Sequence, residues 1–239
     1  GLNLTTDFNF IMVSQMGPRK NFGNAIKWWV EEFIDQEVGL LIKTNLANNS
    51  TIDYQYTDLT LQKVLKQYPD RKCKVYLLHG DLTPGQMISL YNNDKIKAMI
   101  NISHGEGFGL PMFEAARESL PIITVGWSGQ IDFLKHDGKS YFQEVKYTLA
   151  NIQKEAVWDN VLQADSQWAF ADQGSYKMTL RKTYKNWEET KQTAEDLKLI
   201  IDEKFNDDVL YNRFCDFIYK PDPEVESWME ELEEMVNVD

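Results

Sequence analysis

The segment AMINISHGEGFGLP, residues 98–111, joins an apolar run to a helical stretch through a loop with three glycines. The apolar residues from Ala98 to Ile102 predict a buried strand, and Pro111 suits the first turn of a helix. The glycines let the backbone approach a ligand closely, and free N–H groups at a helix start attract a phosphate or a sugar oxygen. The segment therefore predicts a ligand-binding loop at the carboxyl edge of a parallel sheet.

Apolar runs alternate with amphipathic stretches from Phe8 to about Val145. This alternation predicts an α/β fold, a Rossmann-like parallel sheet with helices on both faces. We expect six strands, at 8–14, 38–44, 74–79, 98–102, 122–125 and 141–145. The clearest helix has five apolar residues on one face at helical spacing, Phe22, Ile26, Trp29, Val30 and Phe33. Thr83 and Gln86 predict a capping box at the start of another helix.

The pattern changes after the sixth expected strand. Residues 146–170 lack a strong periodicity, so we expect a long loop that is functional or packed against the protein. Helices resume near Ser175 and are expected to close the domain with the apolar residues Leu210, Phe214, Phe217 and Ile218. The prolines within 220–223 interrupt this helical region. We therefore divide the chain into a Rossmann-like domain, 1–219, and a C-terminal crossover helix, 220–239.

Composition excludes several classes of protein. The chain has 239 residues, a formal charge of −12 and no apolar stretch of the roughly 18 residues that span a bilayer. The charge argues against a nucleic-acid partner, which demands a basic face. The N-terminus has neither a basic leader nor a small-residue cleavage pattern, so we expect a cytoplasmic protein. A start on Gly1, without an initiator methionine, indicates a piece of something longer.

The residues that commonly bind metals do not occur at the spacings typical of metal sites. The two cysteines, Cys73 and Cys215, lie in apolar or mixed segments and are expected to be reduced core thiols. No carboxylate pair at metal spacing follows a strand, so we expect no metal and no other cofactor. His104, a single histidine without an acid–base partner, is expected to have a structural role.

Two carboxylates belong to the glycine-rich segment. Glu106 lies in the loop, where it could hold a polyol, and Glu114 is expected in the first turn of the following helix, on the ligand side. A carboxylate there can accept two hydrogen bonds from vicinal hydroxyls, such as those of a ribose. The alternative is a solvated loop carboxylate and a helix residue that interacts with the helix dipole.

Two adjacent cations, Arg19 and Lys20, stand between the first expected strand and the helix that begins near Phe22. Basic side chains at the carboxyl edge of a sheet, beside a helix start, form a reasonable clamp for a diphosphate. Basic pairs are also common on protein surfaces, so this interpretation stays open from the residues alone.

The spacing of Glu106 and Glu114 within EGFGLPMFE resembles the signature of group 1 retaining glycosyltransferases, family 4 and its relatives of GT-B fold. Four other segments are similar to that family: a lysine-bearing phosphate loop at 18–21, a base-side loop at 78–80, a Gly-Gly-x-x-Glu-like turn at 127–132 and a lead-in to the closing helices at 168–172. The resemblance implies that the chain is the C-terminal, nucleotide-sugar-binding half of a GT-B fold.

The resemblance also implies a role for each matched residue. Lys20, with Arg19, would contact the donor diphosphate, Glu106 the transferred sugar and Glu114 the ribose. Glu106 and Lys20 would be the catalytic residues. Gly80 would belong to the loop on the base side. The backbone of the glycine-rich loop would face the sugar and the phosphates at Gly107, Phe108, Gly109 and Leu110.

Three positions depart from the family pattern. Gln15 stands where the family has an arginine five residues before the lysine, so one diphosphate cation is absent unless Arg19 replaces it. Ser128 stands in place of the first glycine of the turn, and Asp132 in place of its glutamate.

The function implied is transfer of a hexose from a nucleotide-diphosphate sugar to a hydroxyl acceptor, on a sugar, lipid or protein glycan, with retention. The enzyme would be incomplete without an N-terminal acceptor domain, where acceptor choice is expected to lie. Alternatives are a non-catalytic nucleotide-sugar-binding module, which Gln15 favours, and a sugar-nucleotide epimerase of related fold, for which no acid–base pair is present.

The last helix has an apolar stripe, Val225, Trp228, Met229, Leu232, Met235 and Val236. In the family that the chain resembles, a final helix crosses to the partner domain. We therefore expect residues 224–236 either to dock on the protein's own core or to mediate self-association.

Overall fold

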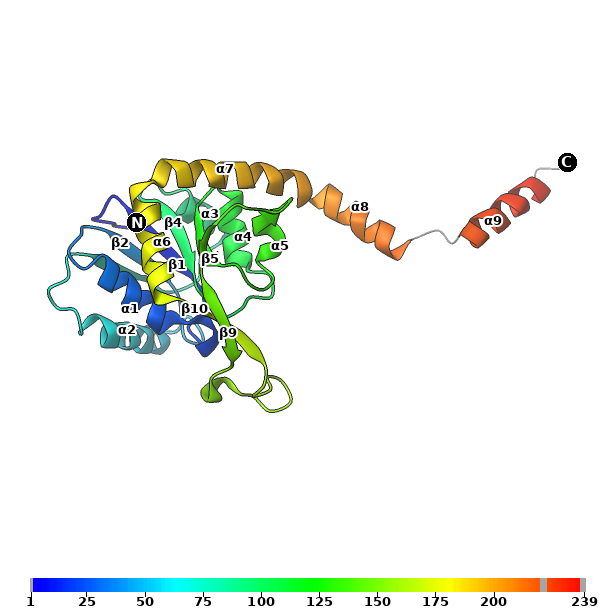
Figure 1. Ribbon diagram of the computed structural model, residues 1–239. Helices are drawn as coiled ribbons and strands as arrows, with labels where there is room; N and C mark the ends of the chain where they lie inside the picture. Colours follow the sequence, from blue (N-terminus) through cyan, green and yellow to red (C-terminus); the bar gives the residue numbers. More distant parts are fainter. Residues whose placement is uncertain (1, 220–222, 237–239) are drawn as a thin grey trace. The chain divides into compact units, whose positions relative to one another are not determined.

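The computed structural model describes residues 2–219 and 223–236. A six-stranded parallel sheet lies at its centre, with helices on both faces (Figure 1). The strands are β1 (Asn9–Val13), β2 (Gly39–Lys43), β3 (Lys74–Leu78), β4 (Ile96–Asn101), β5 (Ile122–Val125) and β8 (Gln143–Val145). Each coincides with one of the six expected strands, so the predicted Rossmann-like fold is confirmed.

The strand order, β3-β2-β1-β4-β5-β8, reverses between β1 and β4. Strands β1 and β4 pair in parallel, with Phe10 opposite Ala98 and Ile11 opposite Met99. The place where ligands usually bind in such sheets is between the loops that follow these two strands at the carboxyl edge, and this place is called the crevice below. The two loops that the sequence singled out, around Lys20 and Glu106, are therefore neighbours.

Helices α1 (Phe22–Glu32), α2 (Thr51–Leu65) and α6 (Gln173–Lys185) neighbour one another on one face, and α3 (Pro84–Tyr91) and α4 (Leu110–Arg117) lie on the other (Figure 1). The apolar stripe predicted for α1 is buried, and Trp29 and Phe33 are fully enclosed. The capping box is also present, because Thr83 Oγ1 accepts the amide of Gln86 and Gln86 Oε1 accepts that of Thr83.

The expectation of a long loop at 146–170 was wrong at both ends of the segment. Strands β9 (Tyr147–Asn151) and β10 (Gln167–Ala171) pair antiparallel, and Figure 1 shows the hairpin extending beyond the sheet. Each strand has five residues, too few for a clear alternating pattern, and their pairing spans a connection of 15 residues. A short 3-10 turn, η2 (Lys154–Ala156), lies within this connection.

Helix α7 (Trp187–Lys204) is fastened at the amino edge of the sheet by side chains that bond to backbone carbonyls. Trp187 Nε1 donates to Lys97 O at 2.9 Å, and Lys191 Nζ donates to Ser119 O at 2.7 Å. Short elements complete this part of the chain: α5 (Ile131–Leu134), β6 (Lys135–His136) and β7 (Lys139–Ser140). None of the helices in the described ranges combines the length and apolarity that crossing a membrane requires.

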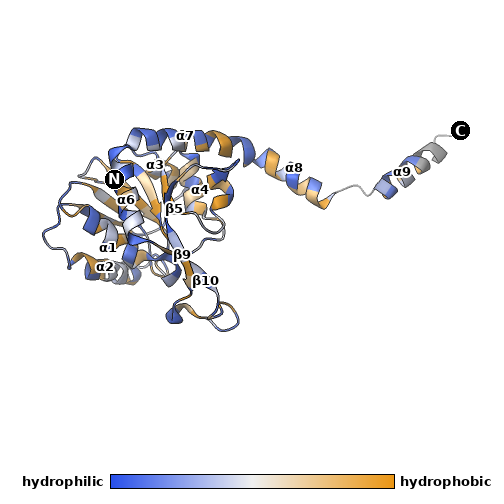
Figure 2. Cartoon of the chain, in the orientation of Figure 1, coloured by the Kyte–Doolittle hydropathy of each residue, from blue (hydrophilic) through white to orange (hydrophobic). Residues whose placement is uncertain are grey.

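The chain divides into two compact units, Gly1–Leu199 and Ile200–Asp239. The second contains α8 (Asp207–Ile218), on which Figure 2 shows several apolar residues. Within this unit these residues, which we expected to close the domain, are exposed, Phe217 by 84%. Cys215 on this helix is exposed as well, whereas Cys73 is buried as expected. An apolar stripe indicates that a helix face needs a cover and does not specify which surface covers it.

Helix α9 (Pro223–Val236) contains the last apolar stripe. Val225, Trp228 and Met229 are each at least half exposed, and Leu232 is 37% exposed. The side chains of Met235 and Val236 lie outside the part that the structure describes, as do residues 220–222. Exposed apolar surface is unfavourable by about 25 cal/mol per Å², which favours association.

We expect the chain to self-associate through residues 224–236, because the apolar residues Val225, Trp228 and Met229 are exposed within the C-terminal unit. Truncation after Lys220 should lower the molar mass measured by light scattering at a given concentration. Trp228→Ser with Met229→Ser should have the same effect, and Glu224→Gln, a polar change on the same helix, should not. An unchanged mass and an unchanged melting temperature after truncation would contradict this expectation.

Candidate functional site

The loops after β1 and β4 meet at the crevice. The loop after β1 contains a 3-10 turn, η1 (Pro18–Lys20), in which Arg19 and Lys20 are adjacent. Its backbone bonds directly to the other loop, because the amide of His104 donates to Arg19 O at 2.8 Å. Asn21 Nδ2 adds a bond to Ile102 O at 3.3 Å. The two cations are thereby placed beside the glycine-rich loop.

Glu106 is the centre of the site. Its side chain is buried, with 7% exposure, and lies where the two loops touch. Lys20 Nζ donates to both carboxylate oxygens, at 2.6 and 2.8 Å, and Arg19 Nη1 donates to Oε2 at 3.0 Å. Asn101 Nδ2 and Ser103 Oγ add bonds to Oε1 at 3.1 and 2.9 Å. Arg19, Lys20 and Glu106, which the sequence analysis assigned to one site, thus form one cluster.

The charges of this cluster favour an anionic ligand. Burial by itself raises the pKa of Glu106, but the hydrogen bonds and charge of Lys20, with bonds from Asn101 and Arg19, lower that pKa below its ordinary value. Glu106 is therefore ionised at neutral pH. Two cations beside one carboxylate leave an excess of positive charge in a partly buried crevice.

The backbone of the glycine-rich loop is held in an open conformation. Gly109 has φ 87°, the left-handed region that favours glycine, and begins α4 as its N-cap. A side chain on Gly107 would meet open space. Phe108 turns its ring toward the body of the protein, against Phe113 and Phe133. Among the described residues, no acceptor is paired with the amides of Gly107, Phe108 and Gly109, so they can donate to an anion.

The turn at 127–130 holds the backbone of Glu106 by hydrogen bonds. Ser128 Oγ donates to Glu106 O at 2.6 Å and accepts from Glu106 N at 3.2 Å, and Gly129 N donates to Glu106 O at 3.0 Å. Ser128 has φ 76°, which explains why glycine suits this position. The strain at Ser128 is offset by two side-chain bonds that glycine could not make. No space remains for a side chain at Gly129, where a Cβ would lie 1.8 Å from Gly107 O.

Glu114 lies apart from this cluster. The expectation that it falls in the first turn of the helix was wrong, because α4 begins at Leu110 and Glu114 is its fifth residue. Its exposed side chain accepts a bond of 3.3 Å from Tyr91 Oη and lines a groove of about 350 Å³ between α3 and α4. Gly80, with φ 102°, follows β3 and precedes the start of α3, whose Pro84 lines this groove.

Asp53 is a residue of this edge that the sequence analysis missed. It is buried in the first turn of α2 and accepts amides from Leu46, Ala47 and Asn48 and a bond of 2.8 Å from His79 Nε2. Burial raises the pKa of Asp53, and these bonds, that of His79 foremost, lower it well below its ordinary range. The signal in the sequence was the spacing of Ser50 and Asp53, an N-cap and the third helical residue.

Gln15 does not take part in the cluster. Its side chain donates to Leu46 O at 2.8 Å, in the loop that follows β2. Arg19 instead provides the second cation beside Lys20, through Glu106 Oε2 and the carbonyl of Gly105. The substitution at Gln15 therefore leaves two cations in the crevice.

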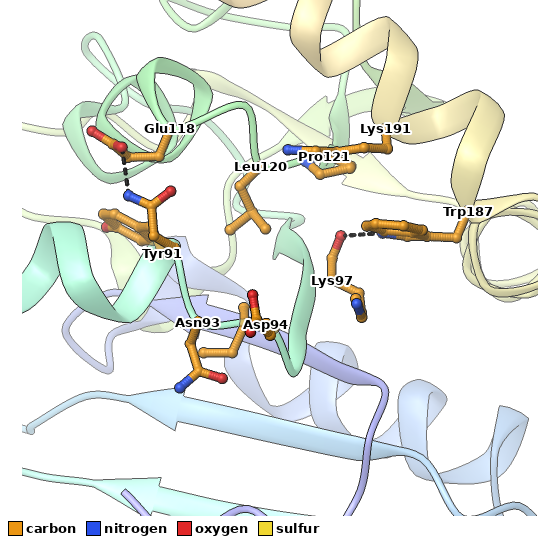
Figure 3. A pocket seen from close by; sticks show the side chains of 11 residues that line it. Tyr91, Asn93, Asp94, Lys97, Glu118, Leu120, Pro121, Trp187 and Lys191 are labelled. Atoms are coloured by element: carbon orange, nitrogen blue, oxygen red, sulfur yellow. Dashed lines mark hydrogen bonds between the residues drawn. The ribbon is translucent and has the colours of Figure 1, made fainter. Parts of the chain in front are cut away.

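A second hollow, of about 210 Å³, lies at the amino edge of the sheet (Figure 3). Trp187 and Lys191 of α7 line it, and both donate to backbone carbonyls there. Lys97 Nζ lies 4.4 Å from the centre of the Trp187 ring. Burial lowers the pKa of Lys191, and the nearby Lys97 lowers it further. These contacts hold α7 against the sheet. The hollow lies at the amino edge, where the strands begin, whereas the crevice lies at the opposite, carboxyl edge.

Comparison of the sequence with known proteins finds similarity over part of the chain. No protein-family model matches the chain. The serotype-specific mannosyltransferase WbdA of Escherichia coli is 31% identical over 116 residues, which are 48% of this chain. These residues are only 13% of WbdA, so the chain is similar to a small part of a much longer protein.

Solved structures show the same fold. The C-terminal domain of the group 1 glycosyltransferase LpcC of Francisella tularensis matches with a TM-score of 0.55 and 15% identity, over 84% of this chain and 88% of that one. HepE of Anabaena, in complex with UDP and glucose, matches with a TM-score of 0.58 and 12% identity, over 89% and 48%. Sucrose-phosphate synthase of Thermosynechococcus elongatus gives 0.61 and 13%, over 89% and 45%. The chain therefore has the Rossmann-like fold of a GT-B glycosyltransferase domain, with a helical C-terminal portion.

The buried cluster predicts a pH dependence of stability. Because the pKa of Glu106 is below the ordinary value of 4.5, its contribution to folding is present above that pH and is lost as the pH falls through the lowered pKa. Glu106→Gln should lower the free energy of unfolding by about 3 kcal/mol at neutral pH, because it leaves the charge of Lys20 unpaired. The difference from the parent protein should shrink below about pH 4.

Urea unfolding at neutral pH and below about pH 4 measures this difference in the free energy of unfolding. Glu37→Gln, which changes an exposed carboxylate with the same charge, is the control and should show neither effect. A cost for Glu106→Gln that stays constant from neutral to acidic pH would mean that its ionisation does not stabilise the fold.

Proposed function

We propose that this chain binds a nucleoside-diphosphate sugar and takes part in transfer of the sugar to a hydroxyl acceptor. The observation that carries the proposal is the buried Glu106, held by Lys20 and Arg19 beneath a loop with open amides. The similarity to part of a mannosyltransferase and to domains of glycosyltransferases supports this class of reaction. HepE, a protein of the same fold, was solved with UDP and glucose.

The donor would lie along the carboxyl edge of the sheet. Its diphosphate would contact Arg19, Lys20 and the amides at the start of α4, where the helix dipole also favours negative charge. The transferred sugar would bond to Glu106. The ribose would reach Glu114 in the groove between α3 and α4, and the base would lie near Gly80, in the loop between β3 and α3.

Donor binding would require an exchange of partners at Glu106. The Arg19 side chain is 45% exposed and that of Lys20 only 18%, so the pair with Arg19 is the weaker one. We infer that Arg19 moves from Glu106 Oε2 to the diphosphate when the donor binds. Glu106 Oε2 is then free to accept a hydrogen bond from a sugar hydroxyl, while Lys20 keeps the carboxylate in place.

The chemistry would depend on stabilisation of the leaving group. As the bond between the sugar and the diphosphate breaks, negative charge grows on the diphosphate, and Lys20, Arg19 and the start of α4 would offset it. Because these groups are already positioned, little reorganisation is needed during the reaction. The resemblance of the segment from Glu106 to Glu114 to retaining enzymes supports retention and a hexose as the transferred sugar.

A complete enzyme would need a second domain to hold the acceptor. The chain covers 48% of HepE and 45% of sucrose-phosphate synthase, as expected for one half of a two-domain enzyme. The second candidate function is a non-catalytic nucleotide-sugar-binding module, which Gln15 favours. Donor hydrolysis or transfer by a protein that includes both domains distinguishes the two, because a binding module would show neither.

The first test of the donor site is a metal-free titration. A nucleoside diphosphate should bind in the presence of EDTA, because Arg19, Lys20 and the loop amides provide the positive charge that a metal would otherwise supply. Calorimetry with uridine and guanosine diphosphates measures the affinity. Absence of binding with both, or strict dependence on magnesium, would contradict the proposed site.

The second test separates the roles of the two glutamates. Glu114→Ala should weaken binding of the bare nucleoside diphosphate, whereas Glu106→Ala should mainly weaken binding of the intact nucleotide sugar. Each loss should be about 1.5–3 kcal/mol, the value of lost carboxylate hydrogen bonds. Glu37→Ala, which removes an exposed carboxylate just before β2, at the amino edge of the sheet, is the matched control and should bind like the parent. Equal effects of the two variants on the bare diphosphate would refute this division of roles.

A further inference from the structure

The β9–β10 hairpin is fastened to the donor site at its base. The amide of Ala169 donates to His104 O at 3.0 Å, and His104 Nδ1 donates to Ala169 O at 2.8 Å. The ring of His104 also stacks on Trp168, with centroids 5.1 Å apart and planes 11° apart. Burial lowers the pKa of His104, which keeps the ring neutral at physiological pH. Strand β10 therefore runs directly beside the glycine-rich loop.

Two more contacts place the hairpin along the crevice. Tyr147 of β9 donates from Oη to Gly126 O at 3.4 Å, and its ring lies 6.2 Å from that of Trp127. In the connection between the strands, η2 neighbours η1, the turn that contains Arg19 and Lys20. The hairpin thus borders the crevice at the glycine-rich loop and at the cations.

The connection between the strands contains a rigid turn. Trp158 N donates to Leu162 O at 3.1 Å and Leu162 N donates to Trp158 O at 2.7 Å, so the two residues pair across three intervening residues. Asn160 has φ 64°, a left-handed conformation that asparagine tolerates in tight turns. The backbone of Trp158 is therefore fixed, two residues after η2.

Most of Trp158 lies outside the packed core, since the residue is 68% exposed. An exposed tryptophan adds little to the stability of the fold, whereas covering its apolar surface with a ligand is favourable. Its neighbours in the turn, Asp159 and Asn160, are exposed and offer hydrogen-bond acceptors and donors. An aromatic side chain beside adaptable polar ones is typical of a recognition surface, because its few rotatable bonds mean that little conformational entropy is lost on binding.

We propose that Trp158, with Asp159 and Asn160, binds the saccharide that accepts the transferred sugar. The indole would cover the apolar C–H face of a pyranose, and the two polar side chains would bond to its hydroxyls. The position beside η1 would bring the acceptor close to the donor that Arg19 and Lys20 hold. This inference rests on the proposed function, and it assigns part of acceptor recognition to this chain, whereas the sequence analysis assigned it to another domain.

A saccharide fits this turn better than a protein partner does. The core of a protein–protein interface is depleted of charged residues and enriched in several large apolar ones. The connection has only Trp158 and Val161 as exposed large hydrophobic side chains, and charged residues at 154, 155, 159 and 165 surround them. A single aromatic platform among polar groups matches a ligand with many hydroxyls.

Nuclear magnetic resonance tests the proposal directly. The indole N–H signal of Trp158 is identified by its loss in Trp158→Ala, and the chain is titrated with trisaccharides of mannose, glucose and galactose. At least one should shift this signal in the parent protein. Trp158→Ala should bind that trisaccharide about tenfold or more weakly, as expected when an aromatic anchor is removed. Trp158→Phe should keep most of the affinity. Leu149→Ala, an exposed residue of the same hairpin, should bind like the parent.

The titrations are made with and without a nucleoside diphosphate, whose own affinity should be equal in the parent and in Trp158→Ala. If no trisaccharide shifts the Trp158 signal, or if Trp158→Ala binds as well as the parent, the acceptor site is refuted while the donor site stands. A change in molar mass of Trp158→Ala by light scattering would show a protein contact at the turn and would also overturn the proposal. Failure of nucleotide binding alone would refute the proposed function.

Discussion

The buried ionic cluster at Glu106 is the interaction on which the site depends. A carboxylate taken out of water is strongly unfavourable unless charges and hydrogen bonds compensate it. Here Lys20 and Arg19 come from the loop after β1, Asn101 from the end of β4 and Ser103 from the loop that follows. The cluster can form only when the two loops are in register, so it fixes the crevice before any ligand arrives. Preorganisation of this kind lowers the cost of binding and of charge stabilisation.

Most of the fold could be predicted from the sequence because its signals are local. The strands of the sheet are short apolar runs between turn residues, and the apolar stripe of α1 needs no knowledge of its partner. The hairpin at 147–171 and the exposure of α8 could not be predicted in this way. The hairpin depends on pairing across a 15-residue connection. For α8, the stripe of Leu210, Phe214 and Phe217 predicts burial, whereas the covering surface is not a property of that helix.

The convergence of Lys20 and Glu106 could be predicted for a topological reason. Carboxyl ends of adjacent parallel strands share one edge, so Lys20 and Glu106 had to be close, although they are 86 residues apart. The sequence did not predict that the cations bond to Glu106 itself. A sequence indicates which groups converge at an edge of the sheet, but not how these groups pair with one another when no ligand is bound. Asp53 was missed for a similar reason. Its Ser50 cap is a local signal, but its bond to His79 exists only in the folded chain.

The strong negative charge of the chain limits how an anionic ligand could be attracted to the crevice. A protein with a formal charge of −12 repels an anionic nucleotide at long range, and salt screens that repulsion beyond about 10 Å at 0.1 M. Attraction must therefore come from short-range contacts. Lys20 is mostly buried, and the amides of Gly107, Phe108 and Gly109 lie in the same crevice, where the effective dielectric is lower than in water and each contact is stronger. An acidic surface is therefore compatible with the proposed binding of a phosphate-bearing ligand in the crevice.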